Sequence, residues 1–385
     1  MDCTRREMLR NLGILFAGSG FTGAECFTGS FRAESTRTRK IPLIHTTDLY
    51  HPPQDPDDQI DLATVLALPE YDLQGVVLDV TERFLHAAPE GWDITREPGY
   101  VPVAQMAHIT RRPIAAAQGP ILPLSHPKDT GEGAAPEQQT GIQVIIDILA
   151  DSSEPVTISV TGSPRAVTAA YNREPELLQK KTRVVLLNAG STGGARVEWN
   201  VQLDPQAYIG LWDSELPIDW FPPGTEAGAF DPAHDRGTYW KTTHAALFRD
   251  LPRELQGYFA YALTMDTRDD IIRALRGPQD DAAWQTILPT QRNLWSTASL
   301  VMGANRVLAR TDEGWRFLPR SEAQGVEIWP WRLDPIQAEV DEKGGVSWQI
   351  VHTATKRRIF GRRPGSEFGA AMTTALNALL REISR

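Results

Sequence analysis

The chain has 385 residues and a formal net charge of −10, with 39 Lys and Arg residues against 49 Asp and Glu residues. This acidic balance excludes a general nucleic-acid-binding surface, because such surfaces need an excess of cations. The length is enough for one large α/β domain or two smaller ones. We find no stretch in the mature region that is apolar over enough residues to span a membrane, and we expect no stable membrane insertion.

The N-terminal segment predicts export. Arg5 and Arg6 lie in the run Thr-Arg-Arg-Glu-Met-Leu-Arg, and a weakly apolar, Gly-rich stretch follows at residues 12–21. This order resembles a twin-arginine signal, which is removed from the mature protein. We therefore expect residues 1–40 to be a signal and linker, and the mature protein to be periplasmic or extracellular. A basic amphipathic helix is the alternative interpretation.

The cysteine count restricts the chemistry of the folded part. Cys3 and Cys26 are the two cysteines of the chain, and both precede residue 30. The folded part therefore has no disulfide, no cysteine-ligated zinc and no cysteine nucleophile.

From residue 41 onward, short apolar runs alternate with helical patterns, which is typical of α/β proteins. The repeated strand–helix–strand order implies a mostly parallel central sheet flanked by helices, with right-handed crossovers. Ligands bind such sheets at the carboxyl ends of the strands, where Asp48, Asp79, Thr161 and Asn188 fall. The strands are predicted at 41–47, 73–78, 113–117, 156–160 and 184–187, and the helices among them at 57–68, 101–110, 141–150 and 165–171.

The second half of the chain is predicted to complete one domain, residues 41–385. A small antiparallel extension is expected within residues 315–351, where short runs alternate. Helices are predicted at 240–249, 254–263, 269–275, 294–308 and 367–380.

The most informative stretch is an acidic loop between the first strand and the first helix. It carries Asp48, Asp55, Asp57 and Asp58 within eleven residues. These carboxylates repel one another unless a cation joins them, and Ca²⁺ or Mg²⁺ takes oxygen ligands of this kind. Asp57 and Asp58 are also favoured at a helix start by its unpaired N–H groups and its dipole. A helix cap with a solvated acidic turn is therefore the alternative.

This loop resembles the start of the inosine–uridine-preferring nucleoside hydrolases. The shared features are a strand that ends at Asp48, the pair Asp57-Asp58 that opens a helix, and Pro69-Glu70 before a second strand. In that family the loop is compact and contains Pro-Gly, whereas here it is longer and contains Asp55. The likeness continues in order through Val-Thr-Gly-Ser-Pro at 160–164, Glu-Trp-Asn at 198–200 with Asp-Pro-Gln-Ala at 204–207, and the strand at 216–221.

The resemblance implies hydrolysis of a ribosyl N-glycosidic bond, with a bound Ca²⁺ that positions water and the ribose hydroxyls. It makes Asp48 a metal ligand and catalytic base, Asp57 a catalytic acceptor for a ribose hydroxyl, and Asp58 a metal ligand. The carbonyl of Thr161 would also bind the metal. Glu198 and Asn200 would bind the substrate by holding the ribose end.

The chain departs from the family where the leaving group is activated. The family often has a His-Asp pair at the start of a late helix, and the corresponding residues here are Trp295 and Ser296. We expect Ser296 at the metal-ligand position and Trp295 to bind substrate by stacking on a base or sugar face. The leaving-group acid is unidentified, and His51, His86 and His234 are candidates.

Two further functions therefore stay open. The chain could be a non-catalytic nucleoside- or sugar-binding protein that kept the pocket, or a hydrolase of another glycosidic substrate. Its partner is a small-molecule nucleoside or sugar in each case, and a homo-oligomer is left open.

Structural roles compete for several of these residues. Asp58 could be a plain helix acid, Asn200 a turn residue and Thr161 an ordinary strand-end residue. Asp204-Pro205 is best explained as a helix N-cap with Pro at the first helical position.

Overall fold

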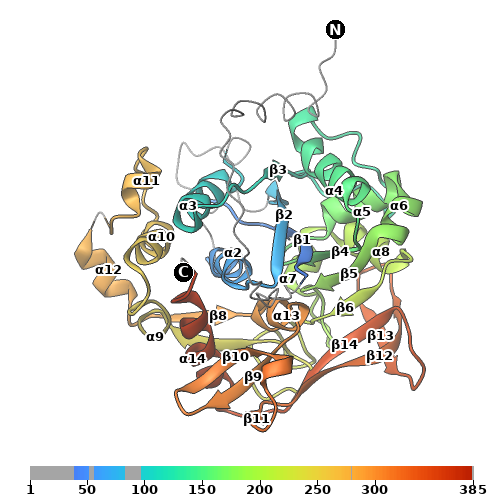
Figure 1. Ribbon diagram of the computed structural model, residues 1–385. Coiled ribbons are helices and arrows are strands. Elements are labelled where there is room, and N and C mark those ends of the chain that lie inside the picture. Colours follow the sequence, from blue (N-terminus) through green and yellow to red (C-terminus); the bar gives the residue numbers. More distant parts are fainter. Residues whose placement is uncertain (1–38, 52–55, 83–96, 279, 384–385) are drawn as a thin grey trace, which may run out of the picture. The chain divides into compact units, whose positions relative to one another are not determined.

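A nine-stranded sheet forms the centre of the fold (Figure 1). The computed structural model describes residues 39–51, 56–82, 97–278 and 280–383, and the compact unit that contains them is Arg39–Arg385. Residues 1–38 of the predicted signal and linker lie outside the described residues. The expected α/β fold with a mostly parallel sheet is confirmed.

Neighbouring strands pair in parallel over most of the sheet, from β14 to β3. The strand order across the sheet is β13 (Val346–Ile350), β12 (Trp331–Val340), β14 (Arg357–Arg362), β6 (Ile218–Trp220), β5 (Thr182–Leu187), β4 (Val156–Val160), β1 (Ile41–Thr47), β2 (Tyr71–Leu78) and β3 (Ala116–Gln118).

Helices cover both faces of the sheet because the parallel strands are apolar on both sides. On β1, Leu43 packs into one core and its neighbour Ile44 into the other. The first core receives residues of α2 (Asp57–Ala67), α3 (Tyr100–Thr110), α10 (Arg253–Leu263), α13 (Thr297–Gly303) and α14 (Phe368–Leu380). The second receives residues of α4 (Thr140–Asp151), α5 (Arg165–Arg173), α6 (Pro175–Lys181) and α8 (Pro205–Asp213), which Figure 1 shows on the opposite side.

The strand order reverses between β1 and β4. From β1 the chain continues outward through β2 and β3, and from β4 it continues the other way through β5 and β6. Consecutive connections leave the sheet on opposite faces at such a switch point, which opens a crevice at the carboxyl ends of the strands. The register aligns these ends, because Asp79 N donates to Thr47 O and Thr161 N donates to Thr46 O. The residues after β1 and β4 therefore border one crevice.

Two predicted helices are wrong in part. Residues 240–249 form β7 (Trp240–Thr243) before α9 (His244–Phe248), since β7 pairs with the distant β8 (Gln291–Leu294). The predicted helix 294–308 instead contains the end of β8, α13 and the start of β9 (Arg306–Thr311). Helix α13 stops at Gly303, and Asn305 then has a φ of 58°, a left-handed conformation that ends a helix.

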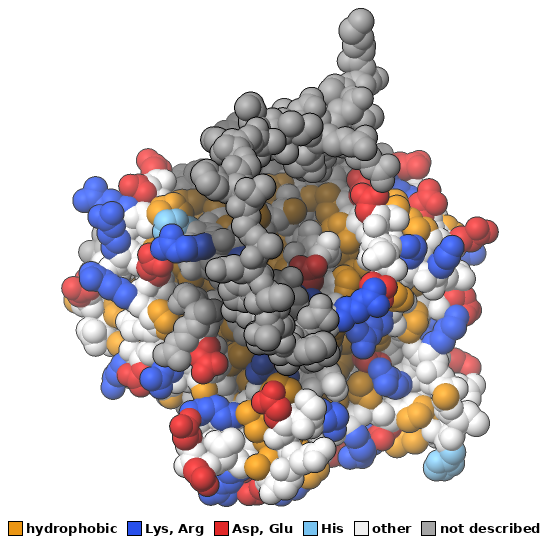
Figure 2. All heavy atoms as spheres, viewed as in Figure 1, with side chains coloured by type: hydrophobic (Ala, Val, Ile, Leu, Met, Phe, Trp, Pro, Cys, Tyr) orange, Lys and Arg blue, Asp and Glu red, His pale blue; other side chains and the backbone are white. Residues whose placement is uncertain are grey.

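The antiparallel extension is present but is divided. Strand β9 pairs with β10 (Gly314–Pro319) and β11 (Glu327–Ile328), whereas the β12–β13 hairpin joins the main sheet through β14. The short helices α7 (Trp199–Leu203), α11 (Ile271–Ala274) and α12 (Asp281–Ile287) complete the described elements that the account uses. Within the described residues, no helix has the length and apolarity needed to cross a membrane. On the face in Figure 2, cationic and anionic side chains are interspersed.

Candidate active site

Asp48 and Asp58 meet at the switch point. Asp48 directly follows β1 and Asp58 lies in the first turn of α2, and both are buried, with 7% and 8% exposed. Oδ1 of Asp58 accepts the hydroxyl of Thr47 at 2.5 Å and that of Thr161 at 2.8 Å. The ends of β1 and β4 are thus both tied to the start of α2.

The two aspartates destabilise each other as anions. Burial raises the pKa of Asp48 well above its usual range, and the charge of Asp58 and a hydrogen bond between the two side chains raise it further. Gly162 leaves room for the Asp48 side chain, because a Cβ at that position would lie 2.9 Å from Cγ of Asp48. A buried pair of this kind either shares a proton or binds a cation.

Asn200 and Glu198 extend the same network. Asn200 Nδ2 donates to the carbonyl of Thr161 at 3.2 Å and to that of Asn188 at 2.8 Å. Glu198 caps α7, and its carboxylate accepts the N–H groups of Asn200 and Val201, as well as that of Gly190. Five predicted site residues are therefore linked in one chain of hydrogen bonds, namely Asp48, Asp58, Thr161, Asn200 and Glu198.

Asn188 contributes a polar atom that the network does not use. It follows β5, is 1% exposed, and donates through Nδ2 to the carbonyl of Val160 at 2.9 Å. Its Oδ1 is buried and has no hydrogen-bond partner among the residues that the structure describes. An unpaired buried acceptor is costly, so a ligand that donates a hydrogen bond is favoured here.

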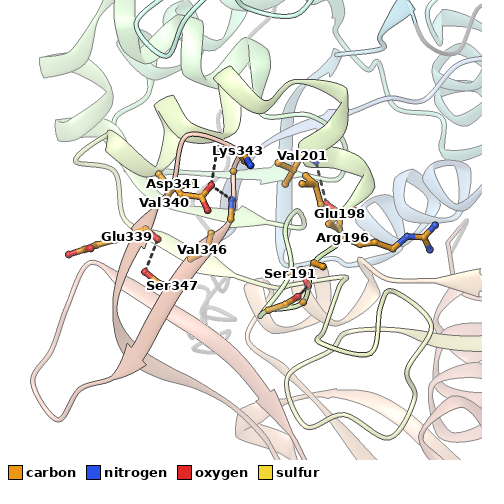
Figure 3. Close-up of a pocket in the computed structure, with 16 residues that line it drawn as sticks. Ser191, Arg196, Glu198, Val201, Glu339, Val340, Asp341, Lys343, Val346 and Ser347 are labelled. Atoms are coloured by element: carbon orange, nitrogen blue, oxygen red, sulfur yellow. Dashed lines mark hydrogen bonds between the residues drawn. The ribbon is translucent and has the colours of Figure 1, made fainter.

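A cavity of about 440 Å³ lies beside Glu198 (Figure 3). It is enclosed by the segment 191–198 on one side and by the turn of the β12–β13 hairpin on the other. Trp348 Nε1 donates to the carbonyl of Thr192, which fastens the hairpin to this segment. Burial raises the pKa of Glu198 to about 7, although its backbone hydrogen bonds oppose the shift. Glu198 thus lines this cavity and is linked to Asp58 through Asn200 and Thr161.

Ser296 approaches the aspartates through Asp61. Asp61 is 1% exposed and lies one turn after Asp58 on α2, and the side chain of Ser296 hydrogen-bonds to it. Burial, and then the charge of Asp58, raises the pKa of Asp61 well above its usual range. Ser296 therefore lies next to a carboxyl group that the sequence interpretation did not single out, and its place as a metal ligand stays a prediction.

Trp295 belongs to an aromatic cluster with Phe230 and Tyr239. Its ring centroid lies 5.8 Å from that of Phe230 and 5.9 Å from that of Tyr239, and its Nε1 donates to the carbonyl of Ala229. Phe230 is 63% exposed, so the cluster has an accessible surface. An aromatic surface beside Ser296 can stack on a planar group.

Two of the three histidine candidates, His51 and His234, are engaged in other contacts. His51 Nε2 lies 2.7 Å from the carbonyl oxygen of Asp266, its ring stacks on Tyr261, and burial lowers its pKa to about 4. His234 pairs with Glu226 at 2.8 Å. His86 and Asp55 lie outside the described residues. Asp57, half-buried, is the first residue of α2 and adjoins Asp58.

The donor set fits a hard divalent cation. Asp48 and Asp58 offer carboxylate oxygens that need positive charge, and the carbonyl of Thr161 lies in the same network. Across the part of the chain that the structure describes, three or more His, Cys, Asp or Glu side chains nowhere gather as a metal-binding group. The candidate oxygen ligands in this network are thus the two carboxylates and the carbonyl of Thr161.

The sequence interpretation missed Thr47, Asp61 and Arg165. Asp61 carried a signal, because it is a carboxylate three residues after Asp58 with an apolar residue on each side, Ile60 and Leu62. Asp204 has the predicted capping role, since it accepts the N–H of Ala207 and Pro205 follows it.

Comparisons with known proteins agree with the fold. No family model matches the chain. The chain is 27% identical over 198 residues to the pyrimidine-specific ribonucleoside hydrolase RihA of Salmonella paratyphi A. The matched region covers 46% of this chain and 58% of that relative. The RihA of Salmonella typhi is 26% identical over the same length. The chain thus spans 58% of the length of these curated relatives.

A solved structure matches over more of the chain. The plant nucleoside hydrolase PpNRh1 superposes with a TM-score of 0.50 and 13% identity, covering 89% of this chain and 99% of that one. At this identity the match shows the fold. The predicted resemblance is confirmed in the fold and in part of the sequence.

Proposed function

We propose that this chain, a divergent relative of the nucleoside hydrolases, hydrolyses the N-glycosidic bond of a ribonucleoside with the help of a divalent cation, Ca²⁺. The observation that carries the proposal is the buried Asp48–Asp58 pair at the switch point, joined to Thr161, Asn200 and Glu198. The partial sequence match to ribonucleoside hydrolases supports the same reaction class.

The residues have distinct roles in this proposal. Cleavage passes through a transition state with positive charge on the sugar, which the carboxylates of Asp48 and Asp57 stabilise. Asp48 takes the proton of the attacking water, and Asp57 accepts a hydrogen bond from a ribose hydroxyl. Asn200 and Glu198 hold the ribose end, and Trp295 stacks on the leaving base. The cation, held by Asp48, Asp58 and the carbonyl of Thr161, would keep both carboxylates ionised and make water more acidic.

The leaving group sets the expected substrate preference. His51 and His234 are engaged in protein contacts, and Ser296 is a poor proton donor. A nitrophenyl riboside needs no protonation on departure, whereas uridine and inosine do. Loss of a general acid typically costs about 10²–10⁴ in rate. We therefore expect the activated riboside to be cleaved about 10²–10⁴ times faster than either nucleoside.

The test is a panel of uridine, inosine and nitrophenyl riboside, with turnover followed by release of base or nitrophenol. Saturable binding of nucleoside without turnover of the activated riboside would identify a binding protein instead. Equal turnover of inosine and the riboside would show that another group serves as the acid. Turnover of a different activated glycoside alone would identify a different glycosidic substrate.

We also propose that residues 1–40 direct export and are absent from the mature protein. The support is the Arg5-Arg6 pair and the Gly-rich stretch after it. Arg5→Lys with Arg6→Lys should leave the protein in the cytoplasm. Mature protein that retains Met1 and stays in the cytoplasm of cells with wild-type Arg5 and Arg6 would contradict export.

A further inference from the structure

Arg165 is a fully buried cation at the carboxyl edge of the sheet. It opens α5, four residues after Thr161, and is 0% exposed. Its Nε donates to Oδ2 of Asp204 at 3.0 Å, and its Nη1 donates to the carbonyls of Val80 and Pro120. One side chain thus joins the segments that follow β2 and β3 to the junction of α7 and α8.

Two buried aspartates surround this guanidinium. Oδ1 of Asp79 lies 3.8 Å from Nη1, while its Oδ2 accepts the N–H of Ala166 at 2.8 Å. Asp204 also accepts the N–H groups of Leu124 and Ala207. Buried ion pairs contribute little net stability, because desolvation offsets their attraction. We therefore explain the contacts of Arg165 with Asp79 and Asp204 by the positions in which they hold the neighbouring segments.

The contacts close a ring that contains two residues of the candidate active site, Asn200 and Thr161. Asp204 directly follows α7, and α7 carries Asn200 in its first turn. Asn200 donates to the carbonyl of Thr161, and the chain runs from Thr161 to Arg165 within four residues. Arg165 then returns to Asp204. Because α7 has only five residues, fixing its end at Asp204 also fixes Asn200 at its start.

We propose that Arg165 is a positioning residue, which acts through Asp204 and α7 to hold the side-chain amide of Asn200 against the carbonyl of Thr161. The effect on turnover rests on the proposed function, whereas the effect on Asn200 does not. A purely structural clamp would stabilise the fold without any special effect on Asn200.

The chain offers a matched control in Arg362. It is 1% exposed and donates to the carbonyls of Gly237 and Pro232, so it is also a buried arginine that joins distant segments, with carbonyls in place of carboxylates as acceptors. It lies on β14, outside the ring. Arg165→Met and Arg362→Met should both lower the melting temperature, but they should differ at Asn200.

The deciding measurement is NMR of side-chain amides in metal-free protein. Arg165→Met should shift the Asn200 amide signals and speed their hydrogen exchange at least tenfold, whereas Arg362→Met should not. Asn377, whose Nδ2 donates to the carbonyl of Leu247, serves as an internal reference that neither variant should change. An unchanged Asn200 amide in folded Arg165→Met, or equal changes in both variants, would overturn the proposal.

Asp204→Asn gives a second variant if Arg165→Met does not fold. In this variant, Oδ1 of residue 204 still accepts the N–H of Ala207. An amide N–H₂ group replaces the other oxygen, which accepts from Nε of Arg165 in the wild type. The same change at Asn200 is expected. In turnover assays, the losses of kcat/KM from Arg165→Met and Asn200→Ala should be less than additive, and additive losses would contradict positioning. A wild type without turnover would refute the proposed function, while the amide measurement would still decide this inference.

Discussion

The hydroxyl of Thr161 donates a 2.8 Å hydrogen bond to Oδ1 of Asp58, which joins the end of β4 to the start of α2 across the switch point. The same oxygen accepts the hydroxyl of Thr47 at the end of β1. Asp58 in turn raises the pKa of the adjacent Asp48 through its charge and a side-chain hydrogen bond, after the larger effect of burial. The two threonines therefore hold the Asp58 carboxylate in place between β1 and β4.

Thr161→Val should weaken this arrangement without changing the side-chain shape. The variant removes one donor to a charged acceptor, and such hydrogen bonds contribute about 1.5–3 kcal/mol. We expect a lower free energy of unfolding in urea, measured in EDTA at pH 8, by about that amount. Thr374→Val is the control, because its hydroxyl donates to the carbonyl of Ala370 at an exposed position. An equal decrease in the free energy of unfolding in the two variants would show that the bond to Asp58 stabilises the fold no more than an exposed hydrogen bond does.

Calcium binding should release protons. Asp48 has a raised pKa in the metal-free protein, and a carboxylate must be ionised to bind a metal. The affinity for Ca²⁺ should therefore rise with pH until Asp48 is ionised in the free protein. Calorimetry in buffers of different ionisation enthalpy measures the released protons at pH 6. Ca²⁺ binding without proton release would contradict this site. An Asp58→Asn variant that binds Ca²⁺ as tightly as wild type would contradict it as well.

Gly162→Ala should displace Asp48. The added methyl group would lie 2.9 Å from Cγ of Asp48, closer than side-chain atoms normally approach. We expect at least a tenfold loss in Ca²⁺ affinity and in kcat/KM. Gly133→Ala is the matched control, because a Cβ there meets nothing within 4 Å. Full Ca²⁺ affinity in both variants would contradict the role of Gly162 beside Asp48.

Glu198 should make stability depend on pH. Its folded pKa of about 7 lies above its ordinary value of 4.5, so the native state binds the proton more tightly than the unfolded chain does. This contribution is complete below pH 4.5 and is lost as the pH rises through 7. One proton corresponds to a slope of at most about 1.4 kcal/mol per pH unit. Urea unfolding of Glu198→Gln between pH 5 and 8 should lack this slope, and an unchanged slope would assign it to other groups.

Local sequence was sufficient for the elements that place the aspartates. The apolar run at 41–47 forms β1 over the predicted residues, and the acids that follow it place Asp58 in the first turn of α2. Thr161 and Asn188 were correctly expected at strand ends. These features depend on patterns within about ten residues, which periodicity and capping can reveal.

The remaining features depend on partners far away in sequence. The strand β7 was mistaken for a helix because its partner β8 lies about 50 residues later. Arg165 carried no local signal, since its contacts with Asp204 and Pro120 span 39 and 45 residues. Buried ionic contacts of this kind arise from tertiary packing, which no sequence window contains.

The central claim is that the aspartate pair at the switch point carries out hydrolysis. The most direct test compares wild type with Asp48→Asn on nitrophenyl riboside, in EDTA and after Ca²⁺ is restored. Asp72→Asn, at an exposed position at the start of β2 and therefore at the opposite end of the strand from the crevice, is the control. Wild type and the control should turn over only with Ca²⁺, and Asp48→Asn should lose about 10²–10⁴ in kcat. Equal rates for wild type and Asp48→Asn, or full activity in EDTA, would contradict the account.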